Sequence, residues 1–195
     1  MKLPSISGII RRRLLLNYRA TPEVIAPLLP ANFRPKLVDG HCIAGICLIR
    51  LEEMRPKGLP KQLGLASENA AHRIAVEWDT DDGVREGVFI PRRDTGSRLN
   101  SLAGGRLFPG VHHLSEFSIS DQDGGISIYI REQNASEPMI QVEAKETDIF
   151  PGDSIFPSLE ASSAFFEAGC TGYSSRPDSN VLDGLLLEAH AWQVW

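Results

Sequence analysis

Hydrophobic and polar positions alternate along most of this chain, which is the pattern of a β-strand with one buried face. In residues 71–78, for example, Ile74 and Val76 fall on one side of the expected strand, while Arg73 and Glu77 fall on the other. The same pattern, or a continuous apolar run, predicts strands over residues 11–18, 41–51, 71–78, 84–90, 111–120, 126–131, 139–145 and 182–195.

Helix signals are few and short. Thr21 and Asp94 are each suited to the N-cap position of a helix, because a short polar side chain can accept a hydrogen bond from the first turn. Gly169 is suited to the end of another helix. Prolines and glycines make residues 57–67 an exposed loop. The three predicted helices cover residues 21–29, 94–103 and 158–168.

Many strands joined by short turns favour an antiparallel architecture. The predicted fold class is mainly β with short helices (α+β), built as a strongly bent antiparallel sheet or closed β-barrel. A parallel sheet is disfavoured, since long crossover helices do not alternate with the strands. With 195 residues and 42% hydrophobic content, the chain suits one domain over residues 1–195.

Charge and apolar content limit the classes of function. A net charge of -5 and an isoelectric point near 5.5 give no basis for binding nucleic acid or an anionic membrane. The basic run from Arg11 to Arg13 is interpreted as a solvated strand start rather than a phosphate site. The N-terminus lacks the apolar run of a signal peptide, no stretch is long enough to span a membrane, and the 3 cysteines suit a reducing compartment. We therefore expect a soluble, cytoplasmic protein.

Familiar catalytic motifs are absent from the sequence. It has no phosphate loop, no G-x-G-x-x-G, no H-E-x-x-H and no G-x-S-x-G. Cys42 and Cys47 are offset by five residues, which places them on opposite faces of a strand. We interpret them as small buried thiols, and predict neither a metal nor a cofactor.

The stretch from Gly104 to Phe117, GGRLFPGVHHLSEF, combines turn residues with two adjacent histidines. On the strand that follows the turn, His113 and Phe117 share one side and His112 takes the other. Phe117 and Ile119 make the first side the expected interior, which would carry His113 inward. Each histidine either lines a ligand cavity or simply stands at the start of a strand.

Arg106 and Glu68 are further candidates. The glycines before Arg106 leave its guanidinium room to reach an anionic ligand, and the alternative is a structural ion pair. Glu68 stands just before a buried strand. It is either a general acid or base in a cavity or an exposed loop carboxylate.

Several segments resemble the acetoacetate decarboxylase-like superfamily, in the same order along the chain. They are Leu15–Gly40 with its T-P-E-V-I-A-P-L-L-P, then Ser67–Asn69, Gly87–Ile90 and Gly105–Pro109. The similarity covers most of the chain and is greatest to the uncharacterised branch of the superfamily, known as a domain of unknown function. It implies that superfamily's bent sheet or barrel.

The resemblance also implies that a catalytic group is missing. In the decarboxylases, a lysine after an aromatic–proline pair forms a Schiff base with a β-keto acid, and burial beside another cation lowers the pKa of that lysine. Here Gly110 follows Pro109, and Leu107 stands where a carboxylate is expected after Arg106. The chain's lysines all lie outside this segment: Lys2, Lys36, Lys57, Lys61 and Lys145.

The resemblance therefore implies a protein that binds or transforms a small carboxylate or carbonyl compound without a Schiff base, by lyase- or hydrolase-like chemistry. Arg106 together with Arg19 would hold the anion. Glu68, His112 or His113 would act as acid or base. The alternative is a non-catalytic module that holds an anionic or apolar small molecule, and a homo-oligomer is compatible with either.

Overall fold

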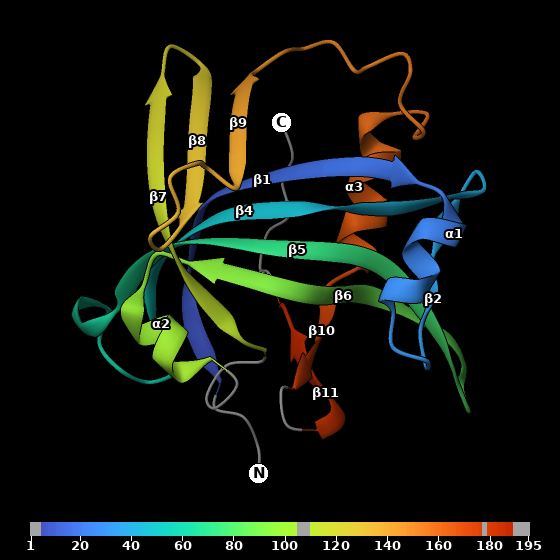
Figure 1. Cartoon of the computed structure of the whole chain (residues 1–195), viewed down its shortest axis with the longest axis horizontal. Coiled ribbons are helices and arrows are strands. Elements are labelled where there is room, and N and C mark those ends of the chain that lie inside the picture. The colour runs from blue at the N-terminus through green and yellow to red at the C-terminus, as the bar shows by residue number, and fades with distance from the viewer. Residues whose placement is uncertain (1–4, 105–109, 177–178, 189–195) are drawn as a thin grey trace. The chain divides into compact units, whose positions relative to one another are not determined.

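The computed structural model describes residues 5–104, 110–176 and 179–188, and most of them lie in β-strands (Figure 1). The mainly β class with short helices is therefore confirmed. The strands are β1 (Ile6–Ala20), β2 (Arg34–Pro35), β3 (Leu37–Val38), β4 (His41–Pro56), β5 (Leu65–Thr80), β6 (Gly83–Thr95), β7 (His112–Gln122), β8 (Gly125–Glu132), β9 (Ile140–Lys145), β10 (Thr171–Arg176) and β11 (Ser179–Leu186). The α-helices are α1 (Pro22–Ile25), α2 (Arg98–Ala103) and α3 (Leu159–Ala168), and the 3-10 turns are η1 (Ala26–Leu28) and η2 (Lys61–Leu63).

These strands form one sheet whose main path runs β1-β4-β5-β6-β7-β8-β9. The pairings β7–β8, β8–β9 and β10–β11 are antiparallel, as the pattern predicted. Two pairings are parallel. In β6, Arg93 lies opposite His112 of β7, and Val88 lies opposite Gly172 of β10. The predicted antiparallel sheet is thus confirmed for the first three pairings, and β6 adds two parallel ones along the edge that does not pair with β5, because the chain returns to that edge after connections that contain a helix.

The described residues gather in two compact units, each made of three chain segments. Strands β1, β4, β5 and β6 each contribute residues to both units. Whether the chain forms the single domain expected over residues 1–195 stays a prediction. Unit 1 comprises Met1–Leu14, Cys47–Ala71 and Arg92–Asp148, and unit 2 comprises Leu15–Ile46, His72–Pro91 and Ile149–Trp195.

Unit 2 has an aromatic core. The ring of Phe33 lies 5.3 Å from that of Trp78 and 5.5 Å from that of Tyr173, and these distances suit favourable tilted or edge-on contacts. Ile74 and Val76 are buried in the same cluster as Trp78, which confirms the predicted apolar side of β5, but Arg73 and Ala75 on its other side are buried as well. This side of the sheet, with Ile74 and Val76, is apolar and tightly packed.

Helix α3 covers the other side of the unit 2 strands (Figure 1). Its Phe166 is buried with Ile43 of β4 and Ala75 of β5. The hydroxyl of Ser158 accepts a hydrogen bond from the amide of Ala161 at 3.2 Å and caps the helix. The helix predicted over 158–168 is thus confirmed.

Unit 1 buries one side of the β7–β8 hairpin. Ile128 and Ile130 are almost completely inaccessible, and they pair with Ile119 and Phe117. Glu116, between the inward positions, is exposed. The sequence pattern therefore identified the interior side of β7 correctly.

The second predicted helix begins later than expected. Helix α2 starts at Arg98, and Ser97 is its N-cap, with a hydroxyl that accepts a hydrogen bond from the amide of Asn100 at 3.3 Å. Asp94, expected to be the cap, is instead fully buried within β6 and bonded to Arg92. A short polar residue can be the N-cap of a helix only where the preceding strand has already ended.

Other boundaries also shift. The helix predicted over 21–29 is a single turn, α1, continued by η1, and Thr21 accepts no side-chain capping bond. The loop predicted over 57–67 is shorter, because β5 already begins at Leu65, and η2 lies between the end of β4 at Pro56 and that strand. Of the strand predicted over 182–195, the part up to Leu186 belongs to β11, and its final residues lie outside the described part of the chain.

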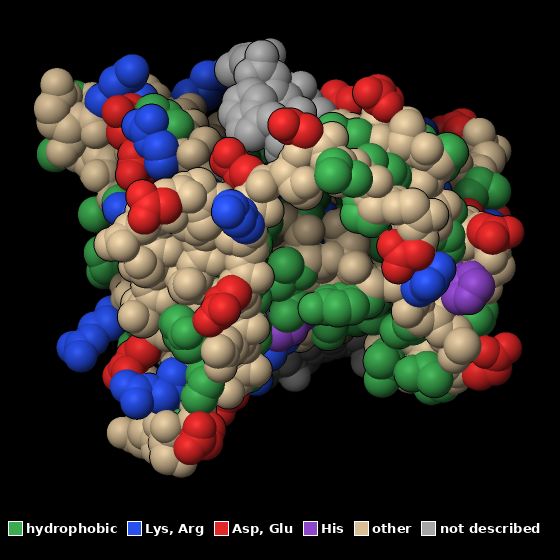
Figure 2. Space-filling model, turned by 90° about the horizontal axis from the view of Figure 1, so that it is seen from above, with side chains coloured by type: hydrophobic (Ala, Val, Ile, Leu, Met, Phe, Trp, Pro, Cys, Tyr) green, Lys and Arg blue, Asp and Glu red, His purple; other side chains and the backbone are tan. Residues whose placement is uncertain are grey.

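One face of the molecule carries intermixed charges. In Figure 2, Lys and Arg side chains (blue) and Asp and Glu side chains (red) are interspersed with hydrophobic ones (green), without a large area of one sign. This face therefore offers no extended basic surface. No helix in the described residues has the length and apolar character needed to cross a membrane.

Candidate functional site

The candidate residues of unit 1 separate onto two faces of the sheet. His112 lies opposite Arg93, and Thr95, two positions further along β6, donates its hydroxyl hydrogen to Asn69 at 2.8 Å. Side chains two positions apart share a face, so these four side chains lie on one side. Glu68 immediately precedes Asn69 and therefore points to the opposite side. Glu68 and His112 cannot act on the same small ligand.

A chain of ion pairs lies on the Glu68 side. Glu68 accepts a hydrogen bond from Arg12 at 2.8 Å and faces Arg50 at 3.4 Å. Arg50 also faces Glu52 at 3.4 Å, and Glu52 in turn pairs with Arg11 at 3.0 Å. Arg11, and after it Arg50, hold the pKa of Glu52 below its ordinary value. We call these five residues, Arg11, Arg12, Arg50, Glu52 and Glu68, the arginine–glutamate cluster.

The arginine–glutamate cluster is only partly accessible. The side chains of Glu68 and Arg12 are 16% and 23% exposed. Ala70, two positions after Glu68 on β5, and Leu48, two positions before Arg50 on β4, are buried. Apolar neighbours reduce the local dielectric and strengthen charge interactions. A small molecule can therefore reach the charges from solvent and still be held strongly.

One donor of the cluster has no acceptor. The Nε–H group of Arg12 is buried, and no described residue accepts its hydrogen bond. The guanidinium uses Nη2 for Glu68, and its Nε–H is left for another acceptor. A buried unpaired donor costs free energy, and an acceptor supplied by a ligand would remove that cost. With three arginines and two glutamates, the cluster carries a formal excess of one positive charge and suits an anionic acceptor.

A second buried carboxylate lies on the same face but is fully engaged. Asp94 accepts two hydrogen bonds from Arg92, at 2.8 and 3.1 Å, and one from the hydroxyl of Ser115 at 3.0 Å. Arg92 also reaches Glu132 at 2.6 Å. Because Asp94 is 0% exposed, a ligand cannot reach it without unfolding the strand. We interpret this group as a structural ion pair.

The His112 side carries a neutral hydrogen-bond network. Asn69 donates to the hydroxyl of Ser67 at 2.9 Å, and Asn100 of α2 donates to the same hydroxyl at 3.1 Å. Thr95 is completely buried, and its hydroxyl accepts a hydrogen bond from the amide of Ser97. Because these groups satisfy one another's hydrogen bonds, the network fixes α2 on the sheet.

His112 itself is a half-buried, neutral residue. Burial, and then the positive charge of Arg93, lower the pKa of His112 to about 4. Its Nδ1 lies 3.1 Å from the carbonyl oxygen of Gly110, so Nδ1 carries the proton and Nε2 keeps a lone pair. His112 can accept a hydrogen bond at neutral pH, but it is too weak a base to be the main proton acceptor.

The other predicted site residues do not join either group. His113 is exposed, although it lies on the interior side of β7, because it stands at the start of the strand where the sheet no longer covers it. Arg19 is exposed in unit 2, with Nη1 3.5 Å from the carbonyl oxygen of Asp153. Arg106 lies outside the described residues.

Arg12 and Arg50 are the functional candidates that the sequence pattern did not reveal. Arg12 was interpreted as part of a solvated basic run, although that run continues directly into the apolar residues Leu14–Leu16. Arg50 is a lone charge at the end of an apolar run. Both signals were present, but neither shows which partner the guanidinium meets.

The fold is that of an acetoacetate decarboxylase-like protein. The chain superimposes on the crystal structure of acetoacetate decarboxylase from Legionella pneumophila subsp. pneumophila str. Philadelphia 1 with a TM-score of 0.58 at 13% identity, which shows the fold alone. The match covers 89% of this chain and 59% of the decarboxylase, so the chain spans less than two thirds of that enzyme's length. An acetoacetate decarboxylase-like enzyme from Sphingomonas wittichii RW1 matches over 63% of this chain and 51% of its own, with 16% identity and a TM-score of 0.46.

The family is defined by sequence. Residues 10–184 match the DUF2071 family of uncharacterized conserved proteins, and the chain belongs to that family. No curated protein matches this sequence. The predicted acetoacetate decarboxylase-like fold and the predicted family of unknown function are both confirmed.

Proposed function

We propose that this protein binds and transforms a small carboxylate or carbonyl compound by acid–base chemistry, without forming a Schiff base. The observation that carries the proposal is the buried Nε–H of Arg12, which has no acceptor among the described residues and stands beside Glu68. A ligand carboxylate would accept from Arg12 and be attracted by Arg50. The acetoacetate decarboxylase-like fold supports a role of this kind.

Glu68 would supply the proton chemistry. In the free protein its two carboxylate oxygens face two arginines. A bound carboxylate draws on the same arginines and adds a negative charge nearby, and both effects make Glu68 a better proton acceptor. Binding should therefore be accompanied by proton uptake. Glu68 could then accept or return a proton at the carbon next to the ligand's carbonyl group.

The test is calorimetric titration with acetoacetate, pyruvate and acetate in buffers of different ionisation enthalpy. Binding by the native protein should take up a fraction of a proton. Arg12→Lys keeps the charge but loses the planar fork, and should weaken binding by about tenfold or more. Glu68→Gln should still bind but should lose the proton uptake and any turnover. Arg131→Met, which removes an exposed arginine paired with Glu116, is the matched control and should bind normally.

Two results would contradict the proposal. If Arg12→Lys bound the ligands as tightly as the native protein, Arg12 would not be the residue that anchors them. Binding without proton uptake or turnover would leave only the non-catalytic binding module.

The absence of an imine can be tested separately. Gly110 has no amine, Lys61 is 70% exposed and Lys57 is exposed. The amine of Lys36 is engaged by Glu86. Treatment with acetoacetate and borohydride should therefore add no mass to the intact protein, since an ordinary lysine is almost entirely protonated at neutral pH. A stoichiometric adduct on any lysine would overturn this part of the proposal.

A further inference from the structure

Unit 1 carries exposed leucines at the connection between β4 and β5. Leu59, Leu63 and Leu65 are all exposed, and Leu63 is 64% exposed. The backbone of this connection is held by hydrogen bonds. The amide of Leu63 donates to the carbonyl oxygen of Pro60 at 3.1 Å, and Nε of Arg55 donates to that of Leu59 at 3.0 Å. The leucines therefore project from a fixed backbone.

Helix α2 places two more exposed leucines next to this connection. Leu99 and Leu102 are both exposed, and Leu102 is 71% exposed. Asn100 of the same helix donates to the hydroxyl of Ser67 at 3.1 Å, only two residues after Leu65. Both segments lie at the left of Figure 1, the connection in teal and α2 in yellow-green. Exposed apolar side chains grouped in this way indicate a surface that contacts a partner.

The same two segments carry positive charge and no negative charge. The stretches KGLPKQLGL, from Lys57, and SRLNSLA, from Ser97, contain Lys57, Lys61 and Arg98 but no aspartate or glutamate. All three cations are exposed, and Glu53, 3.9 Å from Lys61, offsets part of their charge. The net charge of -5 gave no basis for binding an anionic membrane, but it conceals this local positive excess. We call the following residues the leucine–lysine surface: Lys57, Leu59, Lys61, Leu63, Leu65, Arg98, Leu99 and Leu102.

We propose that the leucine–lysine surface docks on the surface of an anionic lipid bilayer. The leucines would enter the boundary between head groups and acyl chains, while the lysines and the arginine keep their charges among the anionic head groups. A protein partner fits less well, because the buried centre of a protein interface is rich in aromatic residues and poor in lysine. The leucine–lysine surface has two lysines and no aromatic residue. This inference goes beyond the proposed function and does not depend on it.

The experiment is flotation of the full chain with vesicles of phosphatidylcholine alone and with vesicles of equimolar phosphatidylcholine and phosphatidylserine. The native protein should bind only the mixed vesicles, and added salt should weaken the binding. Leu63→Gln removes an inserted apolar side chain and should weaken binding about tenfold. Lys61→Gln removes one charge near the head groups and should weaken it about fivefold. Leu28→Gln and Lys145→Gln, at exposed positions outside this surface, are the matched controls and should bind normally.

A second measurement reports directly on insertion. Leu63→Trp should shift the tryptophan emission to shorter wavelength when mixed vesicles are added, because the new ring would leave water for the apolar boundary of the bilayer. Leu28→Trp, at an exposed position of unit 2, should give no such shift. The substituted side chains are exposed in the native protein, so the variants should fold.

Four results would overturn the inference. The native chain could fail to bind the mixed vesicles, or it could bind neutral vesicles equally well. Leu63→Gln and Lys61→Gln could both bind like the native protein. A chain that ignores vesicles could self-associate and lose this self-association in Leu63→Gln, which would make the surface an interface between copies. Arg12→Lys should bind vesicles normally, so failure here and failure of the proposed function can be told apart.

Discussion

Arg12 in unit 1 and Arg73 in unit 2 are both largely buried arginines, but their partners differ in kind. Arg12 is held by a carboxylate, Glu68, and keeps one buried donor without an acceptor. Arg73 is held by an amide oxygen and an aromatic ring. A carboxylate partner can gain or lose a proton, whereas an amide and a ring cannot. The contact of Arg12 with Glu68 is therefore suited to proton chemistry, whereas the contacts of Arg73 with Asn17 and Phe166 only hold its charge in place.

Asp94 provides the largest expected effect, because it is an arginine-bound carboxylate with no access to solvent. Asp94→Ala would leave Arg92 with Glu132 alone and would remove the partner of the Ser115 hydroxyl. We expect the free energy of unfolding, measured by urea denaturation, to fall by about 4 kcal/mol.

The control for this prediction is Glu132→Ala. Glu132 pairs with the same arginine, but its side chain is 52% exposed, and its loss should cost less than about 1 kcal/mol. Equal losses for Asp94 and Glu132 would mean that burial does not distinguish structural from superficial carboxylates here.

His112 tests a third setting for a buried arginine, because Arg93 lies beside the neutral imidazole of His112. Its pKa is about 4 in the native protein and ordinarily 6.5, so below pH 6.5 the unfolded chain takes up a proton that the native state refuses. Stability should therefore fall as the pH drops from 6.5 to 4, by up to about 3 kcal/mol, and this contribution should level off at lower pH.

The measurement is urea denaturation at several pH values. His112→Gln should flatten the pH dependence in this window, since glutamine does not titrate. His113→Gln, at the exposed neighbouring position, should retain most of it. A native-like pH profile in His112→Gln would show that other groups, such as carboxylates, dominate acid destabilisation.

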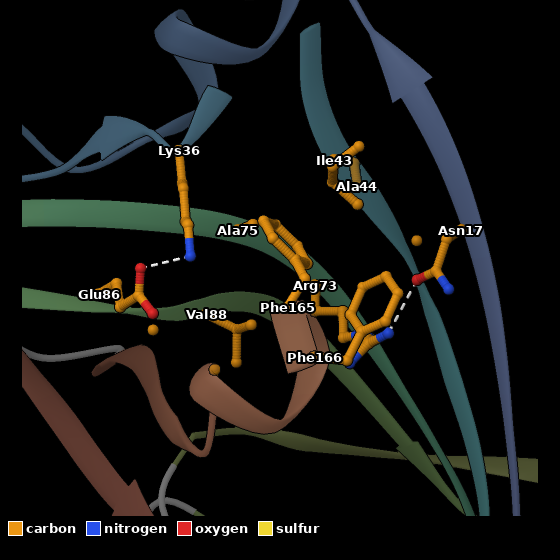
Figure 3. A pocket seen from close by; sticks show the side chains of 13 residues that line it. Asn17, Lys36, Ile43, Ala44, Arg73, Ala75, Glu86, Val88, Phe165 and Phe166 are labelled. Atoms are coloured by element: carbon orange, nitrogen blue, oxygen red, sulfur yellow. Dashed lines mark hydrogen bonds and ion pairs between the residues drawn. The ribbon is translucent and has the colours of Figure 1, made fainter. Parts of the chain in front are cut away.

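Gly45 sharpens the comparison, because it lines a small cavity of unit 2 together with Asn17, Lys36 and Arg73 (Figure 3). A Cβ at this position would lie 2.0 Å from the carbonyl oxygen of Leu16, so the backbone of β1 would have to move. We expect Gly45→Ala to lower the free energy of unfolding by about 2 kcal/mol. Gly152→Ala, where nothing lies within 4 Å of the added atom, should change it little. Similar losses in the free energy of unfolding for the two variants would mean that the backbone beside Gly45 shifts at little cost.

The fold could be predicted well where one face of an element is buried. In β7, the alternation identified the inward side that carries Ser115, Phe117 and Ile119, because a one-residue slip would turn these side chains to solvent. In β5 it identified Ile74 and Val76 but not the burial of Arg73 on the opposite side. The end of β6 was missed at Asp94. A carboxylate inside a strand is indistinguishable by sequence from a helix cap until its arginine partner is known.

The candidate site was predictable only in part. Glu68 was identified by its position next to a buried strand, and the arginine–glutamate cluster brings it together with charged partners. His112 was named in the sequence analysis as an alternative acid or base to Glu68, and the two lie on opposite faces of the sheet. Whether two side chains converge depends on which strands are neighbours. His112 lies on β7, which pairs with β6 in parallel, and the local pattern along the chain does not reveal such a pairing.

The parallel pairing of β10 with β6 has a consequence for the order of folding. Val88 and Phe89 can form this pairing only with Gly172 and Tyr173, which lie more than eighty residues later in the chain. Contacts of such long sequence separation carry a large loop-closure entropy and form slowly. Hairpins β7–β8 and β8–β9 close over short turns and should form much earlier. We therefore expect the aromatic core of unit 2, which includes Tyr173, to be completed late, after the hairpins of unit 1 have already formed.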